Sequence, residues 1–155
     1  MGNRAWKHWV IASILAAALW AAGSSKAEEN AQPKAFNSAV AFDVYAVIGE
    51  KRQSVGSTPS ERPLTLPPCR WWYVEPERPV DVEKVSQEVE AQRIPGLKLR
   101  DATDADLEHL KWLTGLQYLS LGGTQVTDGG LEHLSGLTAL RWLELSDAQV
   151  TDAGR

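Results

Sequence analysis

Cysteine is almost absent from this chain of 155 residues, in which Cys69 stands alone. A single thiol excludes an intrachain disulfide framework and any zinc cluster built on several cysteines. Basic residues are also in deficit, because 16 lysines and arginines face 20 aspartates and glutamates, for a net charge of -4. Nucleic-acid binding rests largely on basic side chains that neutralise phosphates. We therefore expect no nucleic-acid partner.

Long hydrophobic runs are equally scarce. The one apolar run, Val10–Ala22, falls short of the roughly 20 residues that a membrane span needs. Arg4 and Lys7 precede it, and the small residues around Ser25 and Ala27 come after it, an order that is typical of a secretory signal peptide. We predict a signal peptide over residues 1–27 and an exported protein, which is periplasmic, extracellular or on the cell surface. An uncleaved membrane anchor is the alternative, and only then would the protein contact a membrane.

Catalytic motifs are missing as well. There is no nucleophile elbow, no glycine loop that could cradle a phosphate and no metalloprotease helix. His109 and His133 recur at equivalent positions beside glutamates, and we interpret them as exposed polar pairs rather than as metal ligands. No metal, cofactor or enzymatic activity is therefore predicted. The alternative is an enzyme with an unrecognised site within residues 36–80, in a pocket that would lie among Tyr45, Cys69, Trp71 and Tyr73.

Residues 28–80 are predicted to be mostly irregular, with short strands. Phe36–Ile48 is rich in β-branched and aromatic residues, which favours one strand and leaves a short helix open. Gly49–Arg70 contains four prolines and is predicted to be a linker or long loop. Trp71–Val74 is β-prone but closely bounded by prolines, so we expect either an edge strand or an aromatic plug that packs onto the leucine-rich region after residue 97.

Residues 81–96 are predicted to contain a capping helix. Val82, Val85 and Val89 lie on one helical face, and Asp81 is a suitable first residue. A Pro-Gly pair ends the segment. Repeat proteins need such a cap to shield the core of the first repeat, which is the role that we assign to this helix.

From residue 97 to 155 the sequence repeats itself. TDADLEHLKWLTGLQYLSL begins at Thr103, TDGGLEHLSGLTALRWLEL begins 24 residues later at Thr127, and TDAG opens a third copy at Thr151. Two leucines separated by one residue, as in Leu119 and Leu121, point to the same face of a strand. The preceding leucines are three apart, which suits the buried side of a short helix. The Thr-Asp pairs are expected to cap these helices.

These residues resemble the repeat of bacterial leucine-rich-repeat proteins of the ribonuclease-inhibitor-like class, VTD-x-GL-x-x-L-x-x-LT-x-L-x-x-L-x-L. The resemblance implies an α/β solenoid with a short parallel sheet on its concave face and short helices on its convex face. It also implies a module that binds ligands without catalysis. The first strand fits the period only with a two-residue gap, and the repeat is incomplete at Arg155. An alternative is therefore that the chain is a truncated fragment of a longer repeat protein and has no independent function.

Candidate binding residues lie on the predicted concave face. Alternation along each strand turns the residues beside the buried leucines outward. These residues are Lys98, Arg100, Tyr118, Ser120, Trp142 and Glu144. Because aromatic side chains are frequent binding anchors, we expect a protein partner on this face, with a glycan as the second choice. The alternative is that Tyr118 and Trp142 form a cross-strand pair that only stiffens the sheet.

Overall fold

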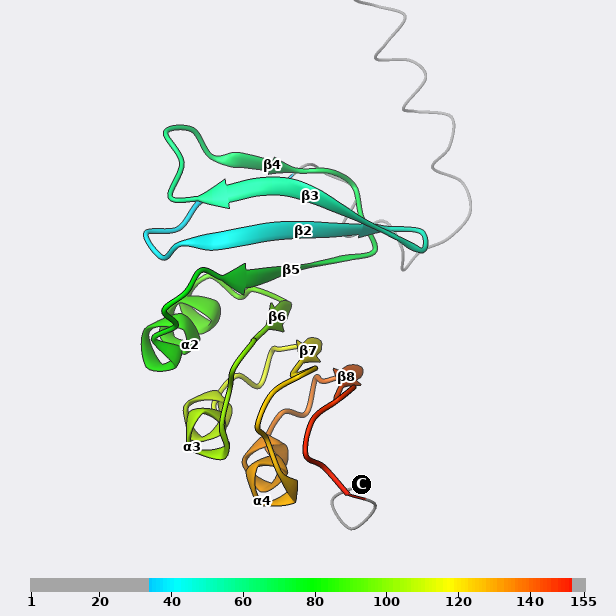
Figure 1. Cartoon of the computed structure of the whole chain (residues 1–155). Coiled ribbons are helices and arrows are strands. Elements are labelled where there is room, and N and C mark those ends of the chain that lie inside the picture. The colour runs from blue at the N-terminus through cyan, green and yellow to red at the C-terminus, as the bar shows by residue number, and fades with distance from the viewer. Residues whose placement is uncertain (1–33, 152–155) are drawn as a thin grey trace, which may run out of the picture. The chain divides into compact units, whose positions relative to one another are not determined.

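The computed structural model describes residues 34–151, and the predicted signal peptide over 1–27 lies outside them. Within this range the protein is α/β, as the sequence predicts, and Figure 1 shows its strands and short helices. Six strands form one mixed sheet in the order β3-β2-β5-β6-β7-β8, and β1 pairs with β4 in a separate two-stranded sheet. The strands are β1 (Lys34–Phe36), β2 (Phe42–Ile48), β3 (Lys51–Thr58), β4 (Leu64–Leu66), β5 (Trp71–Pro76), β6 (Gly96–Lys98), β7 (Tyr118–Ser120) and β8 (Trp142–Glu144). The helices are α2 (Val82–Ala91), α3 (Asp104–Leu107), η2 (Glu108–Leu110), α4 (Asp128–Leu131) and η3 (Glu132–Leu134).

The N-terminal strands correct the prediction that residues 28–80 are mostly irregular. β2 and β3 pair antiparallel along their whole length, and the turn between them contains Gly49 at φ +62°. Gly49–Arg70, predicted to be a linker or long loop, thus contains both β3 and β4. β3 is an edge strand with mostly exposed side chains, so its sequence shows no apolar alternation. Backbone hydrogen bonds to β2 hold it in place, and such pairing does not require a pattern of hydrophobic side chains in the sequence.

β5 also differs from the prediction, because it is an interior strand rather than an edge strand or a plug. It pairs antiparallel with β2 and parallel with β6. Parallel neighbours require a crossover, which α2 supplies. The prolines that bound β5 do not interrupt its pairing, since they lie before Trp71 and at its final position, Pro76.

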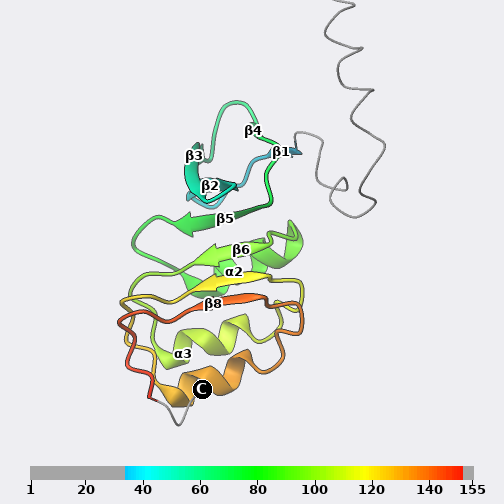
Figure 2. The same cartoon turned by 90° about the vertical axis from the view of Figure 1, so that its right-hand side faces the viewer.

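Helix α2 occupies most of the segment predicted to be a capping helix. Asp81 is its N-cap and accepts a hydrogen bond from the Lys84 backbone N at 3.1 Å, while Val82, Val85 and Val89 are buried. The sheet does not end at this helix, because β5, β2 and β3 continue it. α2 therefore connects two interior strands and covers the same side of the sheet as α3 and α4 (Figures 1 and 2).

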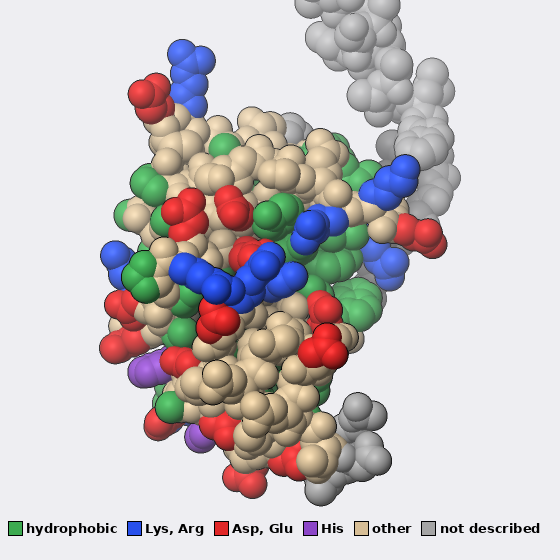
Figure 3. All heavy atoms as spheres, in the orientation of Figure 1, with side chains coloured by type: hydrophobic (Ala, Val, Ile, Leu, Met, Phe, Trp, Pro, Cys, Tyr) green, Lys and Arg blue, Asp and Glu red, His purple; other side chains and the backbone are tan. Residues whose placement is uncertain are grey.

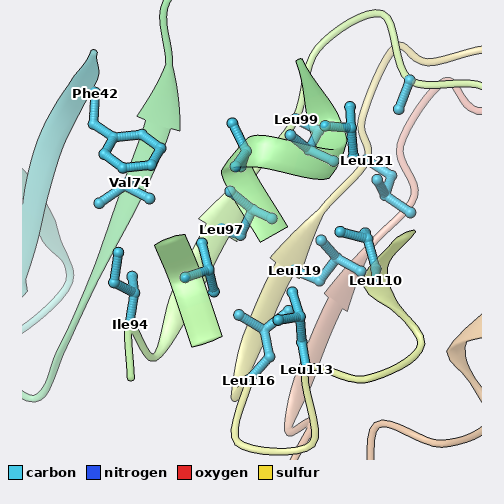
Figure 4. Packing of buried hydrophobic residues seen from close by; sticks show 14 of the residues in the cluster. Phe42, Val74, Ile94, Leu97, Leu99, Leu110, Leu113, Leu116, Leu119 and Leu121 are labelled. Carbon is cyan, nitrogen blue, oxygen red and sulfur yellow. The ribbon is translucent and has the colours of Figure 1, made fainter. Parts of the chain in front are cut away.

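The repeated sequence builds repeated structure. α4, η3 and β8 each begin 24 residues after α3, η2 and β7. The repeated leucines pack between the strands and the helices in a continuous hydrophobic core, part of which Figure 4 shows. From residue 97 onward, the leucines with relative exposure of 2% or less are Leu107, Leu110, Leu113, Leu116, Leu119 and Leu121, together with Leu97 and Leu99 from the first, gapped repeat.

Consecutive repeats are also joined by a polar link. Asp104 accepts hydrogen bonds from the Thr127 backbone N at 2.7 Å and from Thr127 Oγ1 at 2.6 Å. Asp128 accepts the same pair from Thr151. Thr127 meanwhile caps α4 by accepting from the Gly129 backbone N. Thr103 and Thr127 thus lie at helix caps, whereas Asp104 and Asp128 reach to the next repeat, which the capping prediction did not include.

Burial declines toward β8. Leu119 of β7 is fully buried, whereas the equivalent Leu143 of β8 is 40% exposed. β8 is an edge strand of the sheet, and all three of its residues are exposed. Trp112, beside η2, is 70% exposed and does not join the core.

Candidate functional site

One face of the six-stranded sheet carries a transverse row of aromatic side chains. Tyr45 of β2 is the register partner of Tyr73 of β5. The pairing of β5 with β6 places Tyr73 beside Gly96, whose next partners along the row are Tyr118 and Trp142. Adjacent strands lie about 4.8 Å apart, so neighbouring side chains in this row can touch. The row crosses five strands whose residues are far apart in the sequence.

Gly96 allows the row to close over β6. An added Cβ atom at this position would lie 2.6 Å from Tyr73 Cβ and 2.7 Å from the Trp72 carbonyl oxygen. No side chain therefore fits between the two tyrosines, and the ring centroids of Tyr73 and Tyr118 lie 5.3 Å apart across the glycine. This is within the usual separation of interacting aromatic rings.

Trp71 joins the row because it lies two residues before Tyr73 on the same face of β5. Its ring centroid is 4.5 Å from that of Tyr118 and 5.8 Å from that of Tyr73. The rings of Trp71 and Trp142 are nearly parallel, with an interplanar angle of 15° and a centroid separation of 6.0 Å. We call Tyr45, Trp71, Tyr73, Tyr118 and Trp142 the aromatic cluster. Figure 3 shows hydrophobic side chains gathered on the strand side of the molecule, between charged ones.

Two arginines border the aromatic cluster. The Arg70 guanidinium lies 5.6 Å from the Trp142 ring centroid, within cation–π range. Arg52 lies 4.9 Å from the Tyr45 ring centroid and donates a hydrogen bond of 3.4 Å to the Tyr73 hydroxyl. Burial raises the pKa of Tyr73, and this hydrogen bond opposes the increase. Both arginines are exposed and place N–H donors at the rim of the cluster.

A hydrogen bond across the sheet anchors the Tyr118 ring. Its hydroxyl donates a hydrogen bond of 3.1 Å to Glu144 Oε2 on the neighbouring strand. Burial raises the pKa of Tyr118 to about 12, and the negative charge of Glu144 adds to this effect. Tyr118 therefore remains a neutral hydrogen-bonding group at any physiological pH.

A second row of side chains, the polar row, runs beside the aromatic cluster. Its members lie two residues after the aromatic row in the parallel strands β5 to β8 and two residues before Tyr45 in the antiparallel strand β2. The polar row consists of Asp43, Glu75, Lys98, Ser120 and Glu144. Glu75 is only 8% exposed, and its Oε1 forms an ion pair with Arg100 Nε. Glu75 Oε2 is buried and accepts no hydrogen bond from any described residue. Ser120 Oγ, also buried, lies near the Tyr118 hydroxyl without completing a hydrogen bond of ordinary geometry.

One end of the polar row opens into a shallow polar hollow. Its volume is about 630 Å³, and its lining is Asp43, Tyr45, Glu75, Pro76, Glu77, Arg78 and Arg100. Three acids and two bases thus share the hollow, and Tyr45 connects it to the aromatic cluster. Glu75, whose Oε2 has no hydrogen-bond partner among the described residues, is one of the residues that line it.

The structure brings the predicted binding residues together, with differences in access. Tyr118 and Lys98 are half-buried and Trp142 is 40% exposed. Ser120 is completely buried, so solvent does not reach it. Tyr118 and Trp142 are register partners, and Trp71 contacts both of their rings.

Sequence reasoning did not place Tyr45, Trp71 and Tyr73 on the predicted binding face. The spacing of Trp71 and Tyr73 already put both rings on one side of a strand. It could not show that β5 adjoins the repeats, because a parallel register depends on how α2 crosses over. Cys69, grouped with these residues in the enzyme alternative, packs against the hydrophobic core, and burial raises its thiol pKa. This favours the thiol form, which is a poor nucleophile.

Neither a metal cluster nor a membrane helix accompanies the aromatic cluster in the part of the chain that the structure describes. Within residues 34–151, no three His, Cys, Asp or Glu side chains are grouped as a metal ion requires. No helix in the same range has the length and apolarity to cross a membrane. Comparisons with protein-family models, curated proteins and solved structures found no match.

Proposed function

We propose that this protein is a binding module without catalytic activity, and that its ligand lies across the strand face over the aromatic cluster. The observation that supports this most is the convergence of the five rings from four strands. Trp142 nevertheless remains 40% exposed at the edge of the group. Aromatic anchors set in a polar surround are typical of binding surfaces. A role in stiffening the sheet would not require an exposed tryptophan.

We also propose that residues 97–151 form the first turns of a leucine-rich-repeat solenoid. In support, the sequence copies give the same helix and strand 24 residues apart, with their leucines in one core. The polar links from Asp104 to Thr127 and from Asp128 to Thr151 recur at the same interval. In such a solenoid the strand face is the concave one, where a ligand has the largest contact area.

Export is the proposed setting, on the basis of the pattern over residues 1–27. Expression with the native N-terminus in a secreting host, followed by intact-mass measurement, tests it. We expect the secreted protein to begin at Glu28. A chain of full mass that stays with the membrane fraction would favour the anchor instead.

Ligand selection with matched tryptophan variants tests the binding function. The full chain would be screened against a displayed peptide library and an array of oligosaccharides. Trp142→Ala removes an exposed ring of the aromatic cluster, and Trp112→Ala removes an exposed ring on the helix side. We expect ligands selected by the wild type to lose affinity by tenfold or more with Trp142→Ala and to keep it with Trp112→Ala. Ligands that respond equally to both substitutions would overturn the proposal.

A further inference from the structure

We infer that the strand face binds a neutral oligosaccharide, whose sugar rings stack on the aromatic cluster while their hydroxyls bind the accessible side chains of the polar row and the hollow beside it. This inference rests on the proposed binding function and adds the chemical class of the ligand. Three observations support it: the partly exposed aromatic cluster, a buried carboxylate oxygen without a partner, and the balance of charge around the hollow.

The aromatic surface suits the apolar faces of sugar rings. A pyranose presents C–H groups on its broad faces and hydroxyls around its rim, so it stacks on an aromatic ring while its rim stays polar. Trp71 and Trp142 are nearly parallel, and Tyr118 contacts Trp71 at 4.5 Å between centroids. Burial of a flat apolar face against such rings is favourable in water. The polar row then lies along one side of the stacked sugars.

Glu75 supplies the second observation. Its Oε1 is held by Arg100, which fixes the carboxylate, while Oε2 is buried and accepts nothing from the described residues. Leaving a buried acceptor unpaired costs free energy, which a donor from a ligand would recover once the Glu75 side chain turns Oε2 toward the hollow. A sugar hydroxyl is such a donor, and it can at the same time accept from Arg100 or Arg78 at the same hollow. Sugar hydroxyls can therefore donate hydrogen bonds to the acids of the hollow and accept them from its arginines.

Charge balance argues against a charged polymer. Asp43, Glu75 and Glu77 face Arg78 and Arg100 in the hollow, so neither a polyanion nor a polycation meets a surface of one sign. Strong attraction of a charged ligand requires such a surface. The arrangement therefore favours a ligand that is polar and uncharged.

The position of the cluster argues against a peptide added as a strand. That mode of binding uses the unpaired backbone groups of a sheet edge. Tyr45, Tyr73 and Tyr118 instead lie on the face of interior strands, whose backbone groups are already paired. A ligand on this face meets side chains alone, which sugar hydroxyls and C–H faces can satisfy.

Isothermal titration calorimetry on the full chain tests the inference. The neutral probes are cellohexaose, chitohexaose and maltohexaose, and the charged probes are hexagalacturonate and hexalysine. We expect at least one neutral hexasaccharide to bind. We also expect Glu75→Gln to weaken its binding about tenfold, since one oxygen acceptor becomes an N–H donor. Asp43→Asn, at the end of the polar row that lines the hollow, is the second variant and should weaken binding in the same direction.

Glu108→Gln is the matched control, because it neutralises an exposed acid on the helix side. Its affinity for the same sugar should equal that of the wild type, and thermal unfolding would verify that all variants fold. Absence of neutral-sugar binding at millimolar concentration, or sugar binding unchanged in both Glu75→Gln and Asp43→Asn, would overturn the inference. If hexalysine or a selected peptide bound through Trp142 while no sugar did, the binding function would stand and the ligand class would be wrong. If no probe or selected ligand depended on Trp142, both would fail.

Discussion

Gly96 shows how one residue determines whether the aromatic cluster can form. It occupies the central position of the row, where a Cβ atom would collide with both Tyr73 Cβ and the Trp72 carbonyl oxygen. The second of these is backbone and cannot rotate away. The absence of a side chain at this position is therefore what permits the contact between Tyr73 and Tyr118.

Gly96→Ala should lower the free energy of unfolding by about 1–3 kcal/mol, the usual cost of forcing extra volume into packed structure. Gly115→Ala is the control, because an added Cβ there meets no atom within 4 Å, and it should change stability by less than about 1 kcal/mol. Urea unfolding followed by tryptophan fluorescence measures both. Equal effects of the two substitutions would show that β5 and β6 are not packed as described.

Asp104 carries the other single-residue prediction, which concerns pH. Hydrogen bonds from Thr127 Oγ1 and the Thr127 backbone N hold the pKa of this carboxyl below its usual range. A group whose pKa is lower in the folded than in the unfolded state contributes stability above the unfolded pKa, about 3.9 for aspartate. That contribution is lost as the pH falls through the folded pKa.

Asp104→Ala should therefore cost about 1–2 kcal/mol at pH 7, where solvent partly screens the link. The difference from the wild type should shrink as the pH falls from about 5 toward 3. Chemical unfolding across this range measures it. A difference that stays constant down to pH 3 would mean that the ionised carboxylate does not support the link between repeats.

At the scale of elements, β7 and β8 have matching sequences but different surroundings. Leu119 lies in an interior strand and is fully buried, whereas Leu143 lies in the edge strand and is 40% exposed. Leu119→Ala should cost about 2–5 kcal/mol, as is usual for a buried leucine. Leu143→Ala should cost less than about 1 kcal/mol. Equal costs, measured by urea unfolding, would indicate that β8 is covered in solution.

Elements with a strong periodic signal were the ones that the sequence predicted. The valines of α2 form an apolar face that identifies this helix directly. The leucines that recur every 24 residues identify the short helices and strands of the repeat in the same way. β3 and β4 gave no such signal, because β3 is mostly exposed and prolines surround β4. Their pairing is decided by backbone hydrogen bonds and by the turn at Gly49, which side-chain patterns do not report.

At the scale of the whole molecule, the candidate site joins two parts of the chain that the sequence analysis assigned to different regions. Tyr118, Trp142 and Glu144 could be placed on one face from the repeat alone. Trp71 and Tyr73 come from the segment before α2, and only the crossover that sets β5 beside β6 brings them to the same face. Local patterns do not contain that information, because it depends on strand pairing across the helix.

The most direct test of sugar binding at the strand face is to record the tryptophan indole N–H signals of the full chain by NMR during titration with cellohexaose, chitohexaose and maltohexaose in turn. Single Trp→Phe variants assign the signals. Trp71 and Trp142 lie in the aromatic cluster, Trp72 faces the core and Trp112 lies on the helix side. We expect one of these sugars to move the Trp71 and Trp142 signals together and to leave those of Trp72 and Trp112 in place. Movement of Trp112 instead, or no movement of Trp71 and Trp142 with any of the three, would contradict sugar binding at the strand face.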